Sequence, residues 1–193
     1  MEQKTDTISK YENKIITVPN ILSLFRLGLI PIIVWLYRNN NYVWAGCILI
    51  LSGITDIADG YIARHFHMVS NLGKALDPIA DKLTQGVTLL CLLLRFHLMI
   101  MPLVLLIAKE IFMGISGALV IQRTGQVYSA DWHGKAATCL LYGMMMLHVF
   151  WYEITPMASM FSILACTLMI AVSFILYGIR NVRLLRGDKN NGR

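Results

Sequence analysis

Long apolar stretches separated by short polar interruptions make up most of the chain. Each stretch is close to the roughly 20 residues that an α-helix needs to cross a membrane. The interruptions leave no room for a separate soluble domain. The six stretches cover residues 20–38, 42–62, 75–95, 98–121, 136–152 and 156–179. This pattern predicts an all-α integral membrane protein in which six transmembrane helices form one bundle.

The composition agrees with this prediction. Of the 193 residues, 56% are hydrophobic and 15% are charged, and the mean hydropathy is +0.60. An average soluble domain carries roughly 25% charged residues. These values exclude a soluble globular fold, a disordered chain and a disulfide-stapled secreted module. The polar N-terminus also lacks the apolar segment of a cleavable signal peptide. We expect residues 1–193 to form a single membrane domain.

Lysine and arginine are distributed unevenly between alternate connections of the six predicted helices. With the N-terminus inside, the outer loops carry only Arg38 and Arg95. The inner segments carry twelve basic residues: Lys4, Lys10, Lys14, Arg64, Lys74, Arg123, Lys135, Arg180, Arg183, Arg186, Lys189 and Arg193. Because cytoplasmic loops are enriched in Lys and Arg, we expect a multi-pass cell-membrane protein with both termini in the cytoplasm. Residues 1–19 would be a cytoplasmic or interfacial segment, and residues 180–193 a basic cytoplasmic tail.

Four of the eleven acidic residues lie within 26 positions, at the end of the second predicted helix and in the third. Asp56 and Asp59 are three residues apart, and Asp77 and Asp81 are four apart, so each pair shares one helical face. The two helices are consecutive and joined by a short loop, which makes them antiparallel neighbours. We therefore expect the carboxylates to converge at the cytoplasmic ends of helices two and three, where the active site would lie.

A charged side chain within a membrane helix costs about 2.5–3.5 kcal/mol, so this cluster needs a stabilising partner. Divalent Mg²⁺ or Mn²⁺ prefers carboxylate oxygens, and paired ions serve phosphoryl chemistry. Gly60, Ala63 and Gly73 leave space beside the acids for a bulky ligand. Arg64 lies one turn beyond Asp59 and is suited to clamp a phosphate. These features favour a metal-dependent site for a phosphate-bearing substrate.

The acidic cluster is also compatible with three different roles. The acids could form structural ion pairs with Arg64, Lys74 and Lys82. Intramembrane acids also mark cation transporters, although these carry acids near mid-membrane on repeated halves, which this chain lacks. A membrane prenyltransferase would carry two separate Asp clusters, whereas this chain carries one.

Residues 56–81 read DIADGYIARHFHMVSNLGKALDPIAD and match the pattern D-x2-D-G-x2-A-R-x8-G-x3-D-x3-D in full. This pattern is the signature of the CDP-alcohol phosphotransferase family, which the chain resembles. The likeness extends to two further segments: Pro-Asn-x-Leu-Ser-x-x-Arg at residues 19–26 and Gly-Lys-x-x-Thr at residues 134–138. Both are similar to segments of the family's bacterial phosphatidylglycerophosphate synthases and cardiolipin synthases.

The resemblance implies a role for each residue of the signature. Asp56, Asp59 and Asp77 would bind two divalent ions, Mg²⁺ or Mn²⁺. Asp81 would be a further ligand and the catalytic base. The CDP site would be lined by Asn20, Gly60, Ala63, Arg64 and Gly73. The implied reaction transfers the phosphatidyl group of CDP-diacylglycerol to an alcohol and releases CMP. The implied partners are these substrates, the lipid bilayer and a second copy of the chain, and no nucleic acid.

The acceptor alcohol is less well defined. Lys109, Arg123 and Lys135 are suited to bind the phosphate of glycerol 3-phosphate, which would give phosphatidylglycerophosphate. The family's phosphatidylglycerophosphate synthases usually have Arg-Glu where this chain has Lys109–Glu110, and often a further Arg where it has Gly117. A lysine lacks the bidentate fork of arginine. Cardiolipin synthesis, with phosphatidylglycerol as the acceptor, is therefore the alternative.

Overall fold

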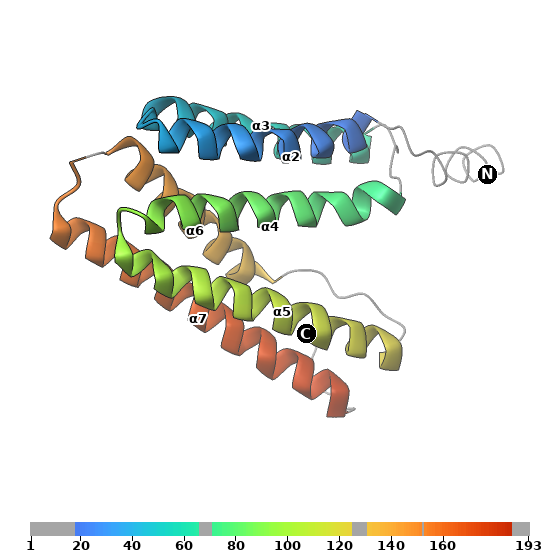
Figure 1. The fold of residues 1–193 in the computed structure, drawn as a ribbon. Coiled ribbons are helices and arrows are strands. Elements are labelled where there is room, and N and C mark those ends of the chain that lie inside the picture. The colour runs from blue at the N-terminus through green and yellow to red at the C-terminus, as the bar shows by residue number, and fades with distance from the viewer. Residues whose placement is uncertain (1–17, 66–70, 125–130, 152, 187–193) are drawn as a thin grey trace. The chain divides into compact units, whose positions relative to one another are not determined.

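The computed structural model describes residues 18–65, 71–124, 131–151 and 153–186. The chain divides into two compact units, residues 1–91 and residues 92–193, which are described separately below. Within the described residues the regular structure is helical (Figure 1).

The first unit holds three long helices: α2 (Val18–Arg38), α3 (Tyr42–His65) and most of α4 (Asn71–Leu93). The α2 and α3 helices pack against each other as a hairpin (Figure 1). The α4 helix is linked to α2 by a hydrogen bond from Ser23 to the carboxylate of Asp77. Side chains from three helices therefore meet in this unit.

A three-residue turn joins α2 to α3. Asn40 has a left-handed backbone conformation (φ 58°), which asparagine tolerates better than most residues. The N–H of Asn40 donates to the carbonyl of Tyr37 (3.1 Å), and the N–H of Asn41 donates to that of Leu36 (2.9 Å). These two bonds form a Schellman motif, which ends α2 and satisfies its last carbonyls.

The second unit holds a short 3-10 helix, η1 (His97–Met99), followed by α5 (Ile100–Thr124), α6 (Trp132–Phe150) and α7 (Pro156–Arg186). The α7 helix packs against both α5 and α6. The amide of Asn181 on α7 donates to the Ser116 hydroxyl on α5 at 2.7 Å. The ring of His148 on α6 lies 3.0 Å from the hydroxyl of Ser159 on α7. Polar side chains thus connect α7 to both of its neighbours.

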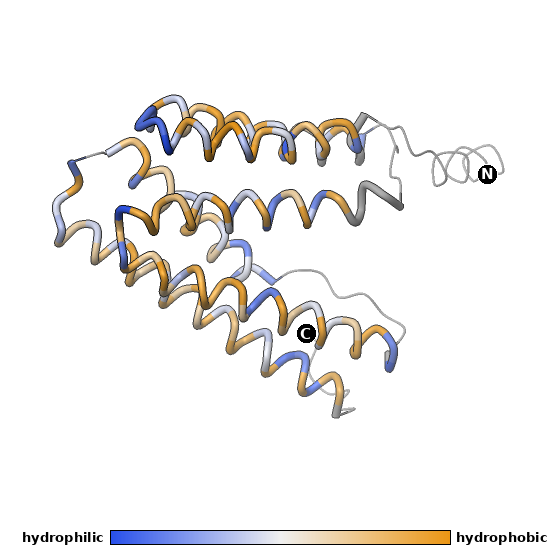
Figure 2. Tube along the Cα trace, viewed as in Figure 1, coloured by the Kyte–Doolittle hydropathy of each residue, from blue (hydrophilic) through white to orange (hydrophobic). Residues whose placement is uncertain are grey.

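Polar side chains are buried and large apolar side chains are exposed on α7. Ser173 and Asn181 are buried, whereas Phe161 and Leu168 are 75% and 67% exposed. Figure 2 shows apolar residues along the length of α5 and α7, and polar residues recurring along α4. An exposed apolar surface, together with polar side chains buried between the helices, is the arrangement expected of helices surrounded by lipid.

Three helical segments of the described chain are long and apolar enough to cross a membrane: Asn20–Arg38, His97–Arg123 and Pro156–Leu185. A shorter apolar segment of α3 covers Tyr42–Ala58 and includes Asp56. The sequence of α3 continues with Asp59 and Arg64, and α4 carries Asp77, Asp81 and Lys82. The charges of the candidate site therefore interrupt the apolar sequences of these two helices.

The prediction of six long helices in an all-α fold is confirmed for the described residues. The ends differ: α4 begins at residue 71 rather than 75, α6 at residue 132 rather than 136, and α7 continues to residue 186 rather than 179. An apolar run shows only which part of a helix is compatible with a membrane. The polar turns at the ends of a helix extend it further, and hydropathy does not reveal them. Residues 1–17 and 187–193, which include most of the predicted N-terminal segment and half of the predicted C-terminal one, lie outside the described residues.

Gly134 allows the first turn of α6 to lie directly against Tyr177 of α7. A Cβ atom at Gly134 would lie 2.2 Å from the Tyr177 hydroxyl oxygen and 2.9 Å from two ring carbons. Tyr177 is buried, and its hydroxyl accepts a hydrogen bond from the N–H of Asp131 at 3.0 Å. Any side chain at position 134 would push this ring away and break that bond.

We therefore expect the Gly134→Ala variant to lose about 1–3 kcal/mol of stability, as overpacking in a close-packed core does. Thermal unfolding in detergent, followed by intrinsic fluorescence, measures this as a lower Tm. The Gly143→Ala variant is the matched control, because Gly143 is also on α6 and a Cβ there meets nothing within 4 Å. Equal Tm values for the two variants would contradict the close approach of α6 to Tyr177.

Candidate active site

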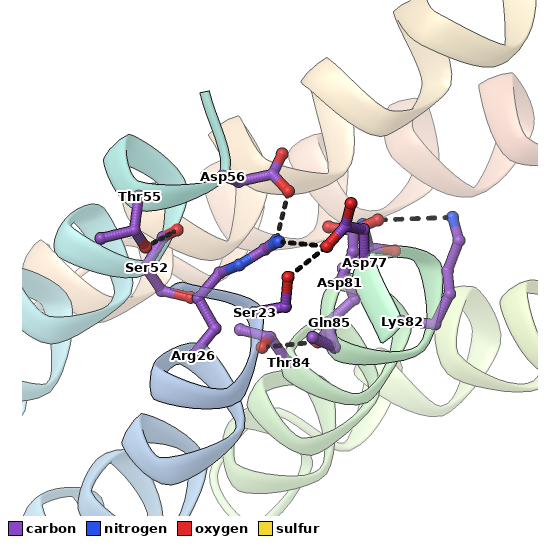
Figure 3. Close-up of polar contacts among 11 residues, drawn as sticks. Ser23, Arg26, Ser52, Thr55, Asp56, Asp77, Asp81, Lys82, Thr84 and Gln85 are labelled. Atoms are coloured by element: carbon purple, nitrogen blue, oxygen red, sulfur yellow. Dashed lines mark hydrogen bonds and ion pairs between the residues drawn. The ribbon is translucent and has the colours of Figure 1, made fainter. Parts of the chain in front are cut away.

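Arg26 lies at the centre of the polar contacts in the first unit (Figure 3). It is on α2, and only 1% of the residue is exposed. Its Nη1 donates to the carboxylate of Asp56 on α3, and its Nη2 lies 3.6 Å from Oδ1 of Asp77 on α4. One buried guanidinium therefore pairs with acids of two different helices.

Asp77 receives a second contact from α2. The hydroxyl of Ser23, which is fully buried, donates to the same Oδ1 of Asp77. Ser23 precedes Arg26 by three residues, so both side chains lie on one face of α2. The face of α2 that carries these two polar residues therefore holds the acidic end of α4.

Asp81 lies one turn beyond Asp77 on α4. The amide Nε2 of Gln85 donates to Asp81 Oδ2 at 2.9 Å, and the ammonium of Lys82 lies 3.7 Å from the same oxygen. Gln85 is fully buried, so its amide has a fixed position. The hydrogen bond from Gln85 therefore orients the Asp81 carboxylate.

The three described carboxylates stay accessible from outside the helices. The side chains of Asp56, Asp77 and Asp81 are 48%, 38% and 23% exposed, whereas that of Arg26 is 2% exposed. Their hard oxygen atoms are the donors that Mg²⁺ and Mn²⁺ prefer, so the residues fit the predicted ions by chemistry and by access. Among the side chains that the structure describes, no three His, Cys, Asp or Glu residues form a ready metal-binding group.

Several predicted residues cannot be compared with the structure in detail. The backbone of α3 includes Asp59, Gly60, Ala63 and Arg64, and that of α4 includes Gly73. Their side-chain surroundings lie outside the described part of the chain. Asn20, the remaining residue predicted for the CDP site, is on α2 and buried. Their assigned roles stay predictions.

Only some of the residues that form ion pairs with the acids are predicted from the sequence. Lys82 does pair with Asp81, as the structural alternative expects. The sequence pattern does not identify Arg26 as a partner, although it pairs with both Asp56 and Asp77. The available signal is an arginine in the first apolar run, since a charge at that place requires a counter-charge. Ser23 and Arg26 also belong to the family-like segment at residues 19–26. Gln85 gives no comparable signal, because uncharged polar residues are tolerated in such helices.

Two of the three residues predicted to bind the acceptor lie far apart on one helix of the second unit. Lys109 and Arg123 are on the same helix, α5, and fourteen residues separate them by about 21 Å along its axis. Lys109 is buried and pairs with Glu110 at 3.0 Å. Lys135 is an exposed residue in the first turn of α6. Lys109 therefore cannot bind the same small phosphate as Arg123.

Arg123 lies in an open pocket at the end of α5. The pocket is lined by Leu119, Gln122, Arg123 and Leu185. The guanidinium of Arg123 donates to the backbone carbonyl of Leu185 on α7. This contact holds the exposed arginine beside the last turns of α7.

A second cluster of charged residues surrounds Asp131, just before α6. Arg180 of α7 donates to Oδ2 of Asp131 at 2.7 Å, and Nε2 of His133 lies 3.3 Å from the same oxygen. His133 is buried and also contacts the Ser173 hydroxyl at 3.3 Å. Arg180, the first residue of the predicted cytoplasmic tail, lies within α7 and pairs with Asp131, so the helix continues beyond its predicted end at residue 179. The cluster fixes the turn that precedes Lys135.

Comparison with known proteins gives several related sequences. Over 142 residues the chain is 33% identical to a cardiolipin synthase (CMP-forming) of Streptomyces coelicolor, covering 70% of this chain and 66% of the relative. It is 38% identical over 96 residues to a CDP-diacylglycerol–glycerol-3-phosphate 3-phosphatidyltransferase of Rickettsia typhi, covering 48% and 54% respectively. A cardiolipin synthase (CMP-forming) of Rattus norvegicus is 42% identical over 80 residues, covering 41% and 26%. The chain thus spans two thirds or less of the length of these relatives.

The family model for CDP-alcohol phosphatidyltransferases matches residues 16–177. This range includes Ser23 and Arg26 of α2 and the ion-paired acids of α3 and α4. The match covers most of the chain, and it includes the segment in which the sequence signature and the acidic cluster coincide. The chain therefore belongs to the CDP-alcohol phosphatidyltransferase family.

Proposed function

We propose that this protein transfers a phosphatidyl group from CDP-diacylglycerol to an alcohol acceptor and releases CMP. The observation that carries the proposal is the gathering of accessible carboxylates from α3 and α4 within the family's signature. The relatives named above are phosphatidyltransferases or CMP-forming cardiolipin synthases, which supports the same reaction class. The family match gives no support to the alternative of a cation transporter.

We assign the metal site to the four acids of the signature: Asp56, Asp59, Asp77 and Asp81. Two divalent ions there, Mg²⁺ or Mn²⁺, would neutralise the negative charge of the substrate pyrophosphate. The family is generally dependent on divalent metals. The oxygen-only donor set and the exposure of the three described carboxylates support this assignment.

Asp81 is the proposed catalytic base. It would take the proton from the acceptor hydroxyl, whose oxygen attacks the phosphorus of the phosphatidyl group while the bond to CMP breaks. Gln85 supports this role, because its hydrogen bond orients the carboxylate before substrate arrives. Asn20, Gly60, Ala63, Arg64 and Gly73 are the proposed residues of the CDP site. Positioning and charge stabilisation would supply most of the catalysis.

Asp77→Asn tests the metal and substrate site with little change in side-chain volume. We expect it to lower CMP release from CDP-diacylglycerol at least about 100-fold, since an amide cannot replace a charged ligand. We also expect it to abolish the rise in Tm that Mn²⁺ produces in the parent protein. Glu153→Gln, at an exposed acid outside the signature, is the control and should retain both properties. Full activity of Asp77→Asn would contradict the assignment.

Glycerol 3-phosphate is the proposed acceptor, and phosphatidylglycerol is the second candidate. Among the described residues, Arg123 and Lys135 are exposed cations in the second unit, and Lys109 is a buried one. Exposed cations suit the phosphate of a soluble acceptor. The named relatives include both a phosphatidyltransferase to glycerol 3-phosphate and cardiolipin synthases, so the second candidate has support from the same comparisons.

A panel of acceptors with labelled CDP-diacylglycerol would distinguish the two candidates by product. We expect phosphatidylglycerophosphate to form, and Lys135→Ala to raise the KM for glycerol 3-phosphate about tenfold, the loss of one charge-assisted contact. Arg183→Ala, which removes an exposed cation of α7, is the control and should leave KM unchanged. Formation of cardiolipin alone would reverse the choice of acceptor. An unchanged KM in Lys135→Ala would remove Lys135 from the acceptor site.

We also propose a multi-pass cell-membrane protein with both termini and the active site in the cytoplasm. The three membrane-compatible helical segments support the membrane location, and the charge asymmetry of the loops supports this orientation. A homodimer is proposed on the family resemblance alone.

Fusions of reporter proteins test the orientation. Green fluorescent protein at the C-terminus should fluoresce, and alkaline phosphatase at the same place should be inactive, because both outcomes require a cytoplasmic terminus. Alkaline phosphatase fused after Glu153 should be active, since we place that connection outside. The reverse pattern of activities would show that the orientation is wrong.

A further inference from the structure

Arg26 is the most completely buried of the charged side chains that the structure describes in the first unit. A charge removed from water is costly unless an opposite charge and hydrogen bonds compensate for it. The compensation comes from Asp56 and Asp77, which belong to different helices and lie 30 and 51 residues away in the sequence. Arg26 and the two acids therefore hold one another in position.

The same two carboxylates are ligands of the proposed metal site. Without a cation between them, Asp56, Asp77 and the neighbouring Asp81 would repel one another. The guanidinium supplies that cation from α2, and its planar fork reaches two acids at once. The acids are thus held together by the protein itself, through a residue outside the signature motif.

We propose that Arg26 is an internal counter-cation: it holds Asp56 and Asp77 together before metal binds, and a divalent ion must compete with it for these carboxylates. The competition rests on the proposed metal site, whereas the holding role does not. Arg26 is a positioning residue in this account, since it acts through the acids. The assignment extends the site to α2, which contributes no residue to the signature motif.

Two physical consequences follow from this arrangement. Removing the charge of Arg26 leaves the acids unpaired, so the metal-free protein should become less stable. The same change removes a positive charge that opposes the incoming ion, so divalent cations should bind more tightly. A residue that serves only as a structural anchor, without competition, would produce the first effect and not the second.

Arg26→Met tests both consequences, because methionine retains an unbranched side chain without the charge. We expect its Tm in chelator to fall by more than about 5 °C, because the two acids lose their counter-charge. We expect its affinity for Mn²⁺, measured by electron paramagnetic resonance without substrate, to rise about tenfold. Arg38→Met, at an exposed arginine in the last turn of the same helix, should match the parent protein in both measurements.

Arg26→Lys keeps the test decisive if Arg26→Met does not fold. Lysine retains the charge but lacks the planar fork of the guanidinium, so both effects should be smaller and in the same direction. Unchanged Mn²⁺ affinity with a lowered Tm would overturn the competition, and an unchanged Tm in chelator would overturn the holding role. If the parent protein bound no Mn²⁺, the proposed metal site would fail, and the Tm in chelator would still decide the holding role.

Discussion

The ion pairs of one buried guanidinium organise the first unit of this protein. Arg26 on α2 is paired with Asp56 on α3 and with Asp77 on α4, and Ser23 adds a hydrogen bond to Asp77. A buried charge is tolerated only where its partners are held in place, so each of the three helices constrains the other two. The chemistry of the site and the packing of these helices consequently depend on the same contacts.

The second unit follows a similar rule with a different arrangement. Its buried or half-buried ionisable side chains have nearby partners: Lys109 has Glu110, and Arg180 and His133 have Asp131. By contrast, Arg123 and Lys135 are exposed at the ends of α5 and α6. Paired charges stabilise the helices, whereas exposed cations are accessible to a ligand. This division gives a physical reason to separate the structural cations from those proposed to bind the acceptor.

Sequence patterns predict the helices and the acids well, and the contacts between helices poorly. Apolar runs and the D-x2-D-G signature depend on neighbouring positions, so they locate all six helices and the α3–α4 acids. The partner of Asp56 and Asp77 lies on another helix, and no local spacing shows which face of α2 meets α3. The ion pair of Arg180 is not predicted for the same reason, because its acid, Asp131, lies 49 residues earlier in the sequence and meets it only in the fold.

The Schellman turn at Asn40 has a consequence for how the sequence can change in length. Arg26 lies twelve residues before the end of α2, and Asp56 lies fourteen residues after the start of α3, so a three-residue connection brings them to a similar depth. One inserted residue between Arg26 and the turn would rotate the guanidinium by about 100° around α2, away from both acids. The ion pairs of Arg26, some four helical turns from the connection, therefore limit insertions and deletions in this hairpin.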